Sequence, residues 1–241
     1  MLRCKVCGEQ RQTAVQFPHT LMTPRCMCRC QREAEKRHER LERIRQRKQH
    51  GLRDLSLFDY TFAHDSGENP VMEKAYAYVR NWEDAYRNNT GLLLFGDVGT
   101  GKSFFAACIA NALLEQDIPV LMTSFPRILN SGWSFEDRAY FLSRLKDYDL
   151  LILDDLGAER GSDYALEQVY SVVDARYRSR KPMIVTTNLK LSEMKNPRDI
   201  EHGRIFSRIL ERCAPILFEG KDFRRDSAEI TKAEARRIVT N

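Results

Sequence analysis

The chain has 241 residues, of which 42% are hydrophobic and 30% are charged, and its formal net charge is +5. This composition is that of an ordinary globular protein, and the length allows one large domain with or without a small appendage. No apolar run approaches the roughly 18 residues that a membrane-spanning helix requires, so we expect no membrane partner. The first residues, MLRCKVCGEQRQ, lack the apolar segment of a secretion signal, and we expect a cytoplasmic protein.

Five of the seven cysteines fall within the first thirty residues. They are Cys4, Cys7, Cys26, Cys28 and Cys30. Cys4 and Cys7 form a C-x-x-C pair followed by Gly8, which is the spacing of a zinc knuckle. Tetrahedral zinc needs four ligands, so a second pair must come from the segment RCMCRC. Free or redox-active thiols are the alternative interpretation.

Residues 31–51, QREAEKRHERLERIRQRKQHG, predict a long helix that ends at Gly51. The segment carries eight Lys or Arg residues and four Glu residues, and its large apolar side chains are Leu41 and Ile44. A helix without a wide apolar face has little to bury, so we expect a projecting connector. Two interpretations stay open for it, a solvated connector and a contact with DNA.

From residue 52 onward, helices alternate with short apolar strands. Pro70 begins an amphipathic helix over residues 70–89. The predicted strands are residues 91–95, 119–123, 150–155, 182–187 and 214–219. The predicted helices between them are residues 102–116, 135–146, 164–179 and 199–212. Strands separated by helices of this length indicate an α/β doubly wound fold, with a five-stranded parallel sheet flanked by helices.

Residues 96–103, GDVGTGKS, match the phosphate-binding pattern G-x-x-x-x-G-K-S between a predicted strand and a predicted helix. The three glycines allow backbone angles that turn successive N–H groups inward around an anion. Lys102 would reach the β- and γ-phosphates, and Ser103 would offer its hydroxyl to Mg²⁺. The expected ATP-binding residues of the loop are Gly96, Asp97, Val98, Gly99, Thr100, Gly101, Lys102 and Ser103.

A phosphate-binding loop hydrolyses nothing without a carboxylate near Mg²⁺ and a group that positions water. The segment YDLLILDDLGAE places Asp154 and Asp155 at the C-terminal end of a strand, which is the ligand-binding rim of such a sheet. Asp154 would hold Mg²⁺, and Asp155 would orient the attacking water. Asn188, which follows the next strand in IVTTN, would hold the water between the γ-phosphate and Asp155.

Together these motifs resemble the AAA+ ATPases of the DnaC/DnaI helicase-loader and IstB transposition-helper group. The likeness is carried by GDVGTGKS, LLILDDLGAE, IVTTNL, GRIFSRILERC and FEGKDFRRD, and it extends from LSLFDYTF onward. It implies an AAA+ P-loop fold, and because few residues follow Arg225 we expect no full lid domain. The second acidic position usually holds Glu in this group, whereas this chain has Asp155, which is shorter by one methylene.

The resemblance also implies roles for polar residues near the end of the chain. Asn188 matches the sensor-1 residue. Arg208 matches the arginine finger that reaches the γ-phosphate of a neighbouring subunit, and Arg204 is a second candidate for it. Arg224 matches the sensor-2 arginine that acts on the subunit's own nucleotide, with Arg225 as the alternative. A rigid guanidinium stabilises the charge that spreads over the γ-phosphoryl oxygens in the transition state.

In the resembling loaders a C-x-C pair stands directly before a Glu-rich helix. This favours Cys28 and Cys30 as the second zinc pair, with Cys26 as the substitute. A head of about thirty residues cannot bury enough apolar surface to fold unaided, so zinc would supply its folding energy. The expected domains are a zinc-binding head at residues 1–31, a basic helical connector at 32–51 and an AAA+ ATPase domain at 52–241.

The resemblance implies an ATP hydrolase with ATP, Mg²⁺ and Zn²⁺ as cofactors, which delivers a hexameric replicative helicase to single-stranded DNA. The N-terminal module would dock on the helicase, and nucleotide would sit at the subunit boundaries of a homo-oligomer. An IstB-like transposition helper is the first alternative, although such helpers usually begin with a helical region instead of cysteines. A nucleotide-stabilised, non-catalytic DNA-binding adaptor is the second, and the set Lys102, Asp154, Asp155 and Asn188 argues against it.

Overall fold

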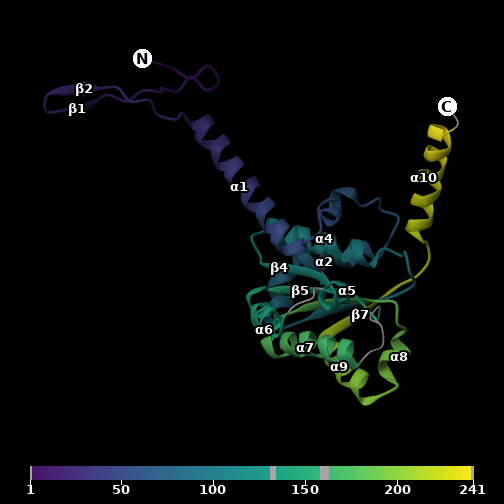
Figure 1. Ribbon diagram of the computed structural model, residues 1–241. Coiled ribbons are helices and arrows are strands. Elements are labelled where there is room, and N and C mark those ends of the chain that lie inside the picture. Colours follow the sequence, from purple (N-terminus) through teal and green to yellow (C-terminus); the bar gives the residue numbers. More distant parts are fainter. Residues whose placement is uncertain (1, 131–133, 158–162, 240–241) are drawn as a thin grey trace. The chain divides into compact units, whose positions relative to one another are not determined.

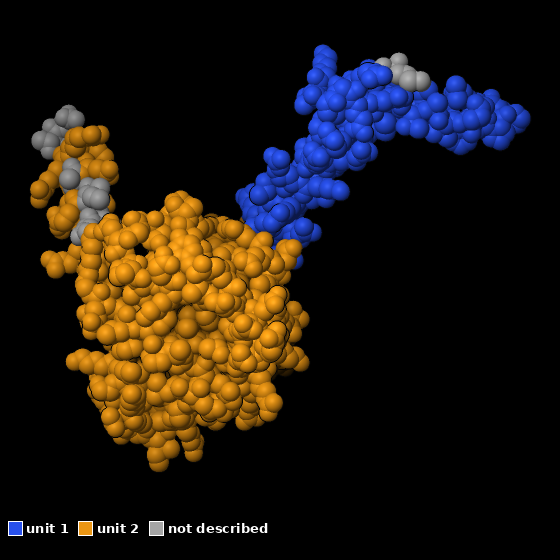
Figure 2. All heavy atoms as spheres, turned by 180° about the vertical axis from the view of Figure 1, so that it is seen from behind, with its two compact units in different colours: residues 1–47 blue, residues 48–241 orange. Residues whose placement is uncertain are grey.

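The computed structural model describes residues 2–130, 134–157 and 163–239 (Figure 1). The chain divides into two compact units, Met1–Arg47 and Lys48–Asn241 (Figure 2). The last two residues of the motif LLILDDLGAE, 158–159, lie outside the described residues. Within the described ranges, no helix is long and apolar enough to cross a membrane.

The first unit holds the cysteine-rich segment and most of one long helix. Strands β1 (Val15–Phe17) and β2 (Thr20–Met22) form an antiparallel hairpin that the sequence analysis did not anticipate. Helix α1 (Arg29–Leu52) begins two residues before the predicted start, so Cys30 lies in its first turn. The helix continues beyond Arg47 into the second unit.

In the second unit, the described residues form a five-stranded parallel sheet, which confirms the predicted fold class. Its strands are β3 (Gly91–Gly96), β4 (Val120–Ser124), β5 (Leu150–Leu156), β6 (Met183–Thr187) and β7 (Cys213–Phe218). The spatial order is β4-β5-β6-β3-β7. Strand β3, the first of these five along the chain, therefore lies inside the sheet, and its carboxyl end is next to those of β6 and β7.

Helices lie on both faces of this sheet, with α2 (Met72–Arg80) and α4 (Lys102–Glu115) on one face and α7 (Asp163–Ser179) and α9 (Ile200–Arg212) on the other (Figure 1). The other helices of the second unit are α3 (Trp82–Arg87), α5 (Phe125–Leu129), α6 (Phe135–Arg144), α8 (Leu191–Lys195) and α10 (Phe223–Val239), of which α10 extends away from the sheet. Short 3-10 helices are η1 (Leu55–Asp59), η2 (Phe62–His64) and η3 (Leu145–Asp147).

The single helix predicted over residues 70–89 is two helices, α2 and α3. They meet at Asn81, whose φ of −104° and ψ of 25° leave the helical region. The side-chain amide of Asn81 donates a hydrogen bond to the carbonyl of Ala77 at 2.9 Å. Asparagine side chains compete for backbone partners in this way, so the apolar periodicity alone did not reveal the break.

Two apolar cores lie on opposite faces of the sheet because neighbouring side chains of a strand point to opposite sides. On β3, Leu92 and Leu94 pack into the core beneath α2 and α4, whereas Leu93 packs into the core beneath α7 and α9. Both faces are covered, which is why the strands read as continuous apolar runs. This packing holds the carboxyl ends of the strands in fixed register.

At the amino ends of the strands, one buried arginine joins β5 to β6. Arg176 of α7 is fully buried and donates to the carbonyls of Leu145, Tyr148, Asp149 and Pro182 over distances of 2.6–3.1 Å. These carbonyls belong to the segments that lead into the two strands. A buried guanidinium is tolerated because its donors meet acceptors inside the protein.

Candidate nucleotide and metal sites

The loop Gly96–Ser103 connects the carboxyl end of β3 to α4. Gly96, Gly99 and Gly101 have φ values of 130°, 79° and 94°, which residues with a Cβ rarely adopt. A Cβ at Gly96 would lie 2.0 Å from the carbonyl oxygen of Phe218, and one at Gly99 would lie 1.9 Å from the Asp222 carboxylate. The loop thus needs glycine both for its turns and for the close approach of the end of β7 and of Asp222, which follows it.

Lys102 begins α4 and lies inside this loop. Its Nζ donates to the carbonyl oxygens of Gly96 at 2.9 Å and Asp97 at 2.5 Å. The side chain is buried, which lowers the pKa of Lys102, while the charges of Asp155 and Asp97 raise that pKa. The two carbonyls hold the ammonium where the loop would surround a phosphate.

Ser103 and Asp154 meet across the base of the loop. The Ser103 hydroxyl donates to both carboxylate oxygens of Asp154 at 3.0 Å, and the Thr186 hydroxyl donates to Oδ1 at 2.6 Å. Burial raises the pKa of Asp154, while the hydrogen bonds from Thr186 and Ser103 lower it. A hydroxyl beside a carboxylate is the oxygen pair that would hold Mg²⁺ next to a phosphate.

Asp155 and Asn188 border a cavity of about 670 Å³ beside the loop. Asp155 has a φ of 61°, and its N–H donates to the Thr186 hydroxyl at 2.9 Å. Asn188 is exposed and directly follows β6. The cavity is lined by Tyr60, His64, Asp65, Ser66, Asn69, Met72, Val98, Gly99, Gly101, Lys102, Ser103, Phe104, Asp155, Asn188, Phe223 and Arg224.

The four arginines of interest differ in where the structure places them. Arg224 lines the cavity, whereas Arg225 does not. Neither Arg204 nor Arg208 is part of the cavity lining of its own chain. Both lie on α9, where Arg204 is exposed.

Arg208 is held inside its own chain by α7. Its guanidinium lies 2.9 Å from the Asp174 carboxylate and 3.0 Å from the Tyr170 hydroxyl. The guanidinium also stacks over the ring of Tyr170 at 4.8 Å. Its side chain is 22% exposed, so it lies between two helices and still reaches the surface.

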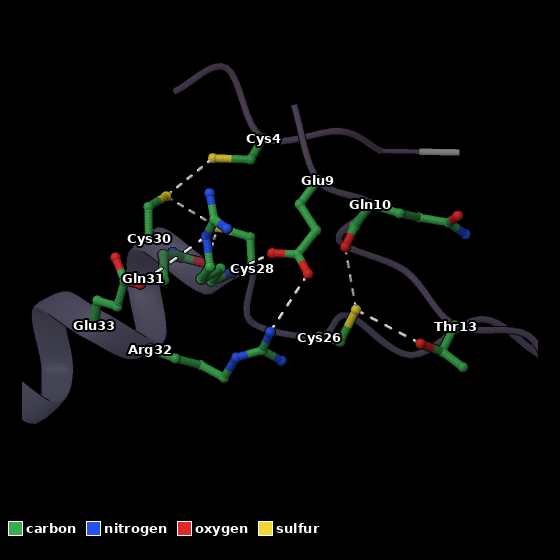
Figure 3. A network of polar contacts seen from close by, with 11 residues as sticks. Cys4, Glu9, Gln10, Thr13, Cys26, Cys28, Cys30, Gln31, Arg32 and Glu33 are labelled. Atoms are coloured by element: carbon green, nitrogen blue, oxygen red, sulfur yellow. Dashed lines mark hydrogen bonds and ion pairs between the residues drawn. The ribbon is translucent and has the colours of Figure 1, made fainter. Parts of the chain in front are cut away.

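The cysteine cluster belongs to the first unit. The sulfur atoms of Cys4, Cys7, Cys28 and Cys30 lie within 4.8 Å of one another. Cys30 Sγ is 3.5 Å from Cys4 Sγ and 3.2 Å from Cys28 Sγ (Figure 3). A tetrahedral zinc with bonds of about 2.3 Å separates its sulfur ligands by about 3.8 Å. These four residues therefore fit a zinc ion.

The charge state of the cluster also suits a cation. Backbone N–H groups of Cys7 and Val6 lower the pKa of the Cys4 thiol to about 6. Hydrogen bonds to the neighbouring Cys28 and Cys4 sulfur atoms raise the pKa of Cys30, because a thiol that donates to its neighbours holds its proton more tightly. A bound divalent ion would replace that proton, since metal ligands of this kind are thiolates.

Cys26 lies apart from the cluster. Its thiol contacts the carbonyl oxygen of Gln10 and the hydroxyl of Thr13, each at 3.6 Å (Figure 3). Cys26 and Cys28 are two residues apart, but their thiols have different partners. The structure thus groups the expected pair, Cys28 and Cys30, with Cys4 and Cys7, and leaves the substitute outside.

Comparison with protein families matches residues 13–229 to the family described as IstB-like ATP binding protein. The chain belongs to this family. Curated relatives of the IstB-like chain include two proteins named replicative helicase loader. DnaI of Bacillus subtilis is 27% identical over 184 residues, and DnaC of Escherichia coli K12 is 30% identical over 173 residues.

The alignment with DnaI covers 70% of this chain and 59% of DnaI. The alignment with DnaC covers 67% of this chain and 67% of DnaC. The chain thus spans about three fifths of the length of DnaI. Among solved structures, the crystal structure of DnaI has a TM-score of 0.62 at 22% identity and covers 74% of this chain and 99% of that one. A DNA replication initiation factor has a TM-score of 0.55 at 19% identity, over 73% of this chain and 55% of that one. At these identities the likeness shows the fold, which is the predicted AAA+ fold.

Sequence reasoning missed one wall of the nucleotide cavity of this IstB-like chain. Tyr60 and His64, from the η1–η2 segment, line it. The segment is fixed by Asn111 of α4, whose buried amide donates to the carbonyls of Leu57 at 2.8 Å and Tyr60 at 2.9 Å. A polar residue in the otherwise apolar helix segment FFAACIANALL was the signal that could have revealed this anchor.

The cysteine cluster predicts a specific metal stoichiometry. We expect about one zinc ion per reduced chain, retained in Cys26→Ser and lost in Cys28→Ser, because Cys26 has other partners. Metal analysis after gel filtration checks this, and nucleotide binding should persist in both variants. Zinc-free wild-type protein, or equal zinc loss in the two variants, would contradict the assignment.

Thr186 predicts a pH dependence of magnesium binding. Thr186→Val removes the hydroxyl that donates to Asp154, so the carboxyl pKa rises further and the proton stays bound to higher pH. We expect Mg²⁺-dependent affinity for a fluorescent ATP analogue to fall by about 10- to 100-fold, given about 1.5–3 kcal/mol for a hydrogen bond to a charged group. As the pH is lowered, the variant should begin to lose this Mg²⁺-dependent affinity at a higher pH than the wild type does.

Thr187→Val is the matched control, because the Thr187 hydroxyl donates to the Leu156 carbonyl and leaves Asp154 untouched. In Thr187→Val, the Mg²⁺-dependent affinity should fall over the same acidic pH range as in the wild type. If both variants show the same pH profile, Thr186 does not tune Asp154.

Proposed function

We propose that this chain is an ATP hydrolase that delivers a hexameric replicative helicase to single-stranded DNA. The observation that carries the proposal is that Lys102, Ser103, Asp155 and Asn188 line one cavity and that Ser103 donates to Asp154 directly behind it. The chain in which they meet is similar to DnaI and DnaC. We also propose that the protein acts in the cytoplasm.

For hydrolysis, we assign separate tasks to the residues around the cavity. Ser103 and Asp154 hold Mg²⁺, which when bound neutralises phosphate charge. Lys102 and Arg224 contact the phosphates, and Lys102 is already fixed inside the loop. Asp155 takes a proton from the attacking water, and Asn188 orients that water.

We further propose that the active form is a homo-oligomer with ATP at the subunit boundaries. The support comes from Arg208, which is a partly exposed guanidinium outside the cavity of its own chain. In an assembly it would leave Asp174 and act on the γ-phosphate of the neighbouring subunit. Arg204, one turn earlier on α9, is the second candidate.

The zinc-bearing unit is the proposed docking module for the helicase. Its hairpin exposes apolar side chains that have no core to enter, among them Phe17 at 48% and Leu21 at 60%. Exposed apolar side chains grouped on a small module are typical of a protein-binding surface. A transposition-helper function is the second candidate, because the matching family is described as IstB-like.

A mixing experiment tests the subunit boundary. Arg208→Ala should keep nucleotide affinity and lose turnover, by up to about 10³–10⁵-fold for an arginine supplied in trans. Lys102→Ala should lose nucleotide affinity. Mixtures of the two should regain part of the activity, because some boundaries then combine an intact loop with an intact arginine.

The control is Arg178→Ala, since Arg178 also pairs with Asp174, at 2.8 Å, but lies 75% exposed on α7. It should retain turnover. No recovery at any mixing ratio, with a rate per subunit independent of concentration, would show that the site works within one chain.

Helicase delivery is tested by capture and transfer. The wild-type protein should retain candidate replicative helicases in pull-downs and place them on single-stranded DNA circles in an ATP-dependent reaction. Asp155→Asn should still bind ATP and capture the helicase, because Asp154 remains to hold the metal. Its turnover of ATP should be slow, because the attacking water has lost its anionic partner. Capture of a transposase instead would favour the helper function, and capture of neither would overturn the proposal.

A further inference from the structure

Basic side chains recur along α1 at intervals of three or four residues. They are Arg29, Arg32, Lys36, Arg40, Arg43 and Arg47. At about 100° per residue, these six positions fall within an arc of about 80° and extend over about 27 Å of the helix. We call these six residues the basic stripe, and all of them belong to the first unit.

The middle of the basic stripe is available for a ligand. Lys36, Arg40 and Arg43 are exposed, and in the part of the chain that the structure describes none of them has an ion-pair partner. Towards the start of the helix, Arg29 pairs with Glu33 at 3.9 Å and Arg32 with Glu9 at 3.4 Å. Exposed pairs of this kind contribute little and exchange readily with other partners.

The acidic residues of α1 occupy other positions on the helix. Glu33 and Glu39 lie along the two edges of the basic stripe, and Glu35 and Glu42 lie farther round. A helix stabilised only by its own ion pairs would mix both signs on one face. In α1, six of the nine basic residues fall in one row with carboxylates along both edges, and the other three, Arg37, Arg45 and Lys48, lie on other faces.

A single row of cations, spaced by about one helical turn of 5.4 Å, fits one line of phosphates. Five of the six stripe residues are arginines, whose planar guanidinium can donate two hydrogen bonds to one phosphate. The flanking carboxylates disfavour the second phosphate row that a duplex would bring. The exposed Leu41 lies off the row, so the stripe offers no apolar anchor for a protein partner.

We propose that the basic stripe of α1 binds the phosphate backbone of single-stranded DNA without reading its sequence. The inference rests on the proposed function for its choice of partner and places a DNA contact on the zinc-bearing unit. It makes α1 a DNA-binding element as well as a connection between the two units.

Two charge-matched double variants of the full-length protein test the proposal. Arg40→Gln with Arg43→Gln removes two charges from the stripe, and Arg37→Gln with Arg45→Gln removes two exposed charges from other faces of the same helix. Glutamine has a helix propensity close to that of arginine. The affinity for labelled oligothymidine is measured by fluorescence anisotropy over a series of salt concentrations.

The stripe variant should bind about tenfold or more weakly at 0.1 M salt. The negative slope of log K against log salt should become shallower by about 1.4, which is about 0.7 for each lost phosphate contact. The control variant should stay within about twofold of the wild type. Zinc content and nucleotide affinity should be unchanged in both.

Three results would overturn the inference. Equal losses in the two variants would show a response to net charge alone. Unchanged DNA affinity with lost capture of the helicase would make the stripe a protein-binding surface. A stronger effect on duplex than on single-stranded DNA would reject the assigned ligand. Failure of the wild type to bind DNA at all would instead count against the proposed function.

Discussion

The hydrogen bonds that Ser103 and Thr186 donate to Asp154 hold the nucleotide site together. They join the start of α4 to the carboxyl ends of β5 and β6, three elements far apart in the sequence. Their geometry depends on the strand order, which places β6 between β5 and β3. The apolar cores on the two faces of the sheet are needed to keep those strand ends in register.

The buried charges at the two ends of the sheet are stabilised to different extents. At the amino ends of the strands, the guanidinium of Arg176 is buried and donates its hydrogen bonds to backbone carbonyls, so this charge needs no further partner. At the carboxyl ends, burial raises the pKa of Asp154, and two hydroxyl donors only partly offset it. The carboxyl ends gain from a cation, whereas the amino ends do not need one.

Local pattern was enough to predict the sheet, the phosphate loop and the acidic strand end, because each is encoded in consecutive residues. The break at Asn81 was not predictable from periodicity, since the apolar face continues across it. The cavity wall at Tyr60 depends on Asn111, about fifty residues later in the chain. Spacing alone left Cys26 as an alternative to Cys28, because only folding decides which thiol turns towards Cys30.

The left-handed backbone of Asp155, with a φ of 61°, restricts which carboxylate can stand at this position. Aspartate and asparagine occupy this region more readily than longer side chains do. A glutamate here would need the same backbone angle at a cost of about 1–2 kcal/mol. The turn itself therefore favours the shorter of the two carboxylates.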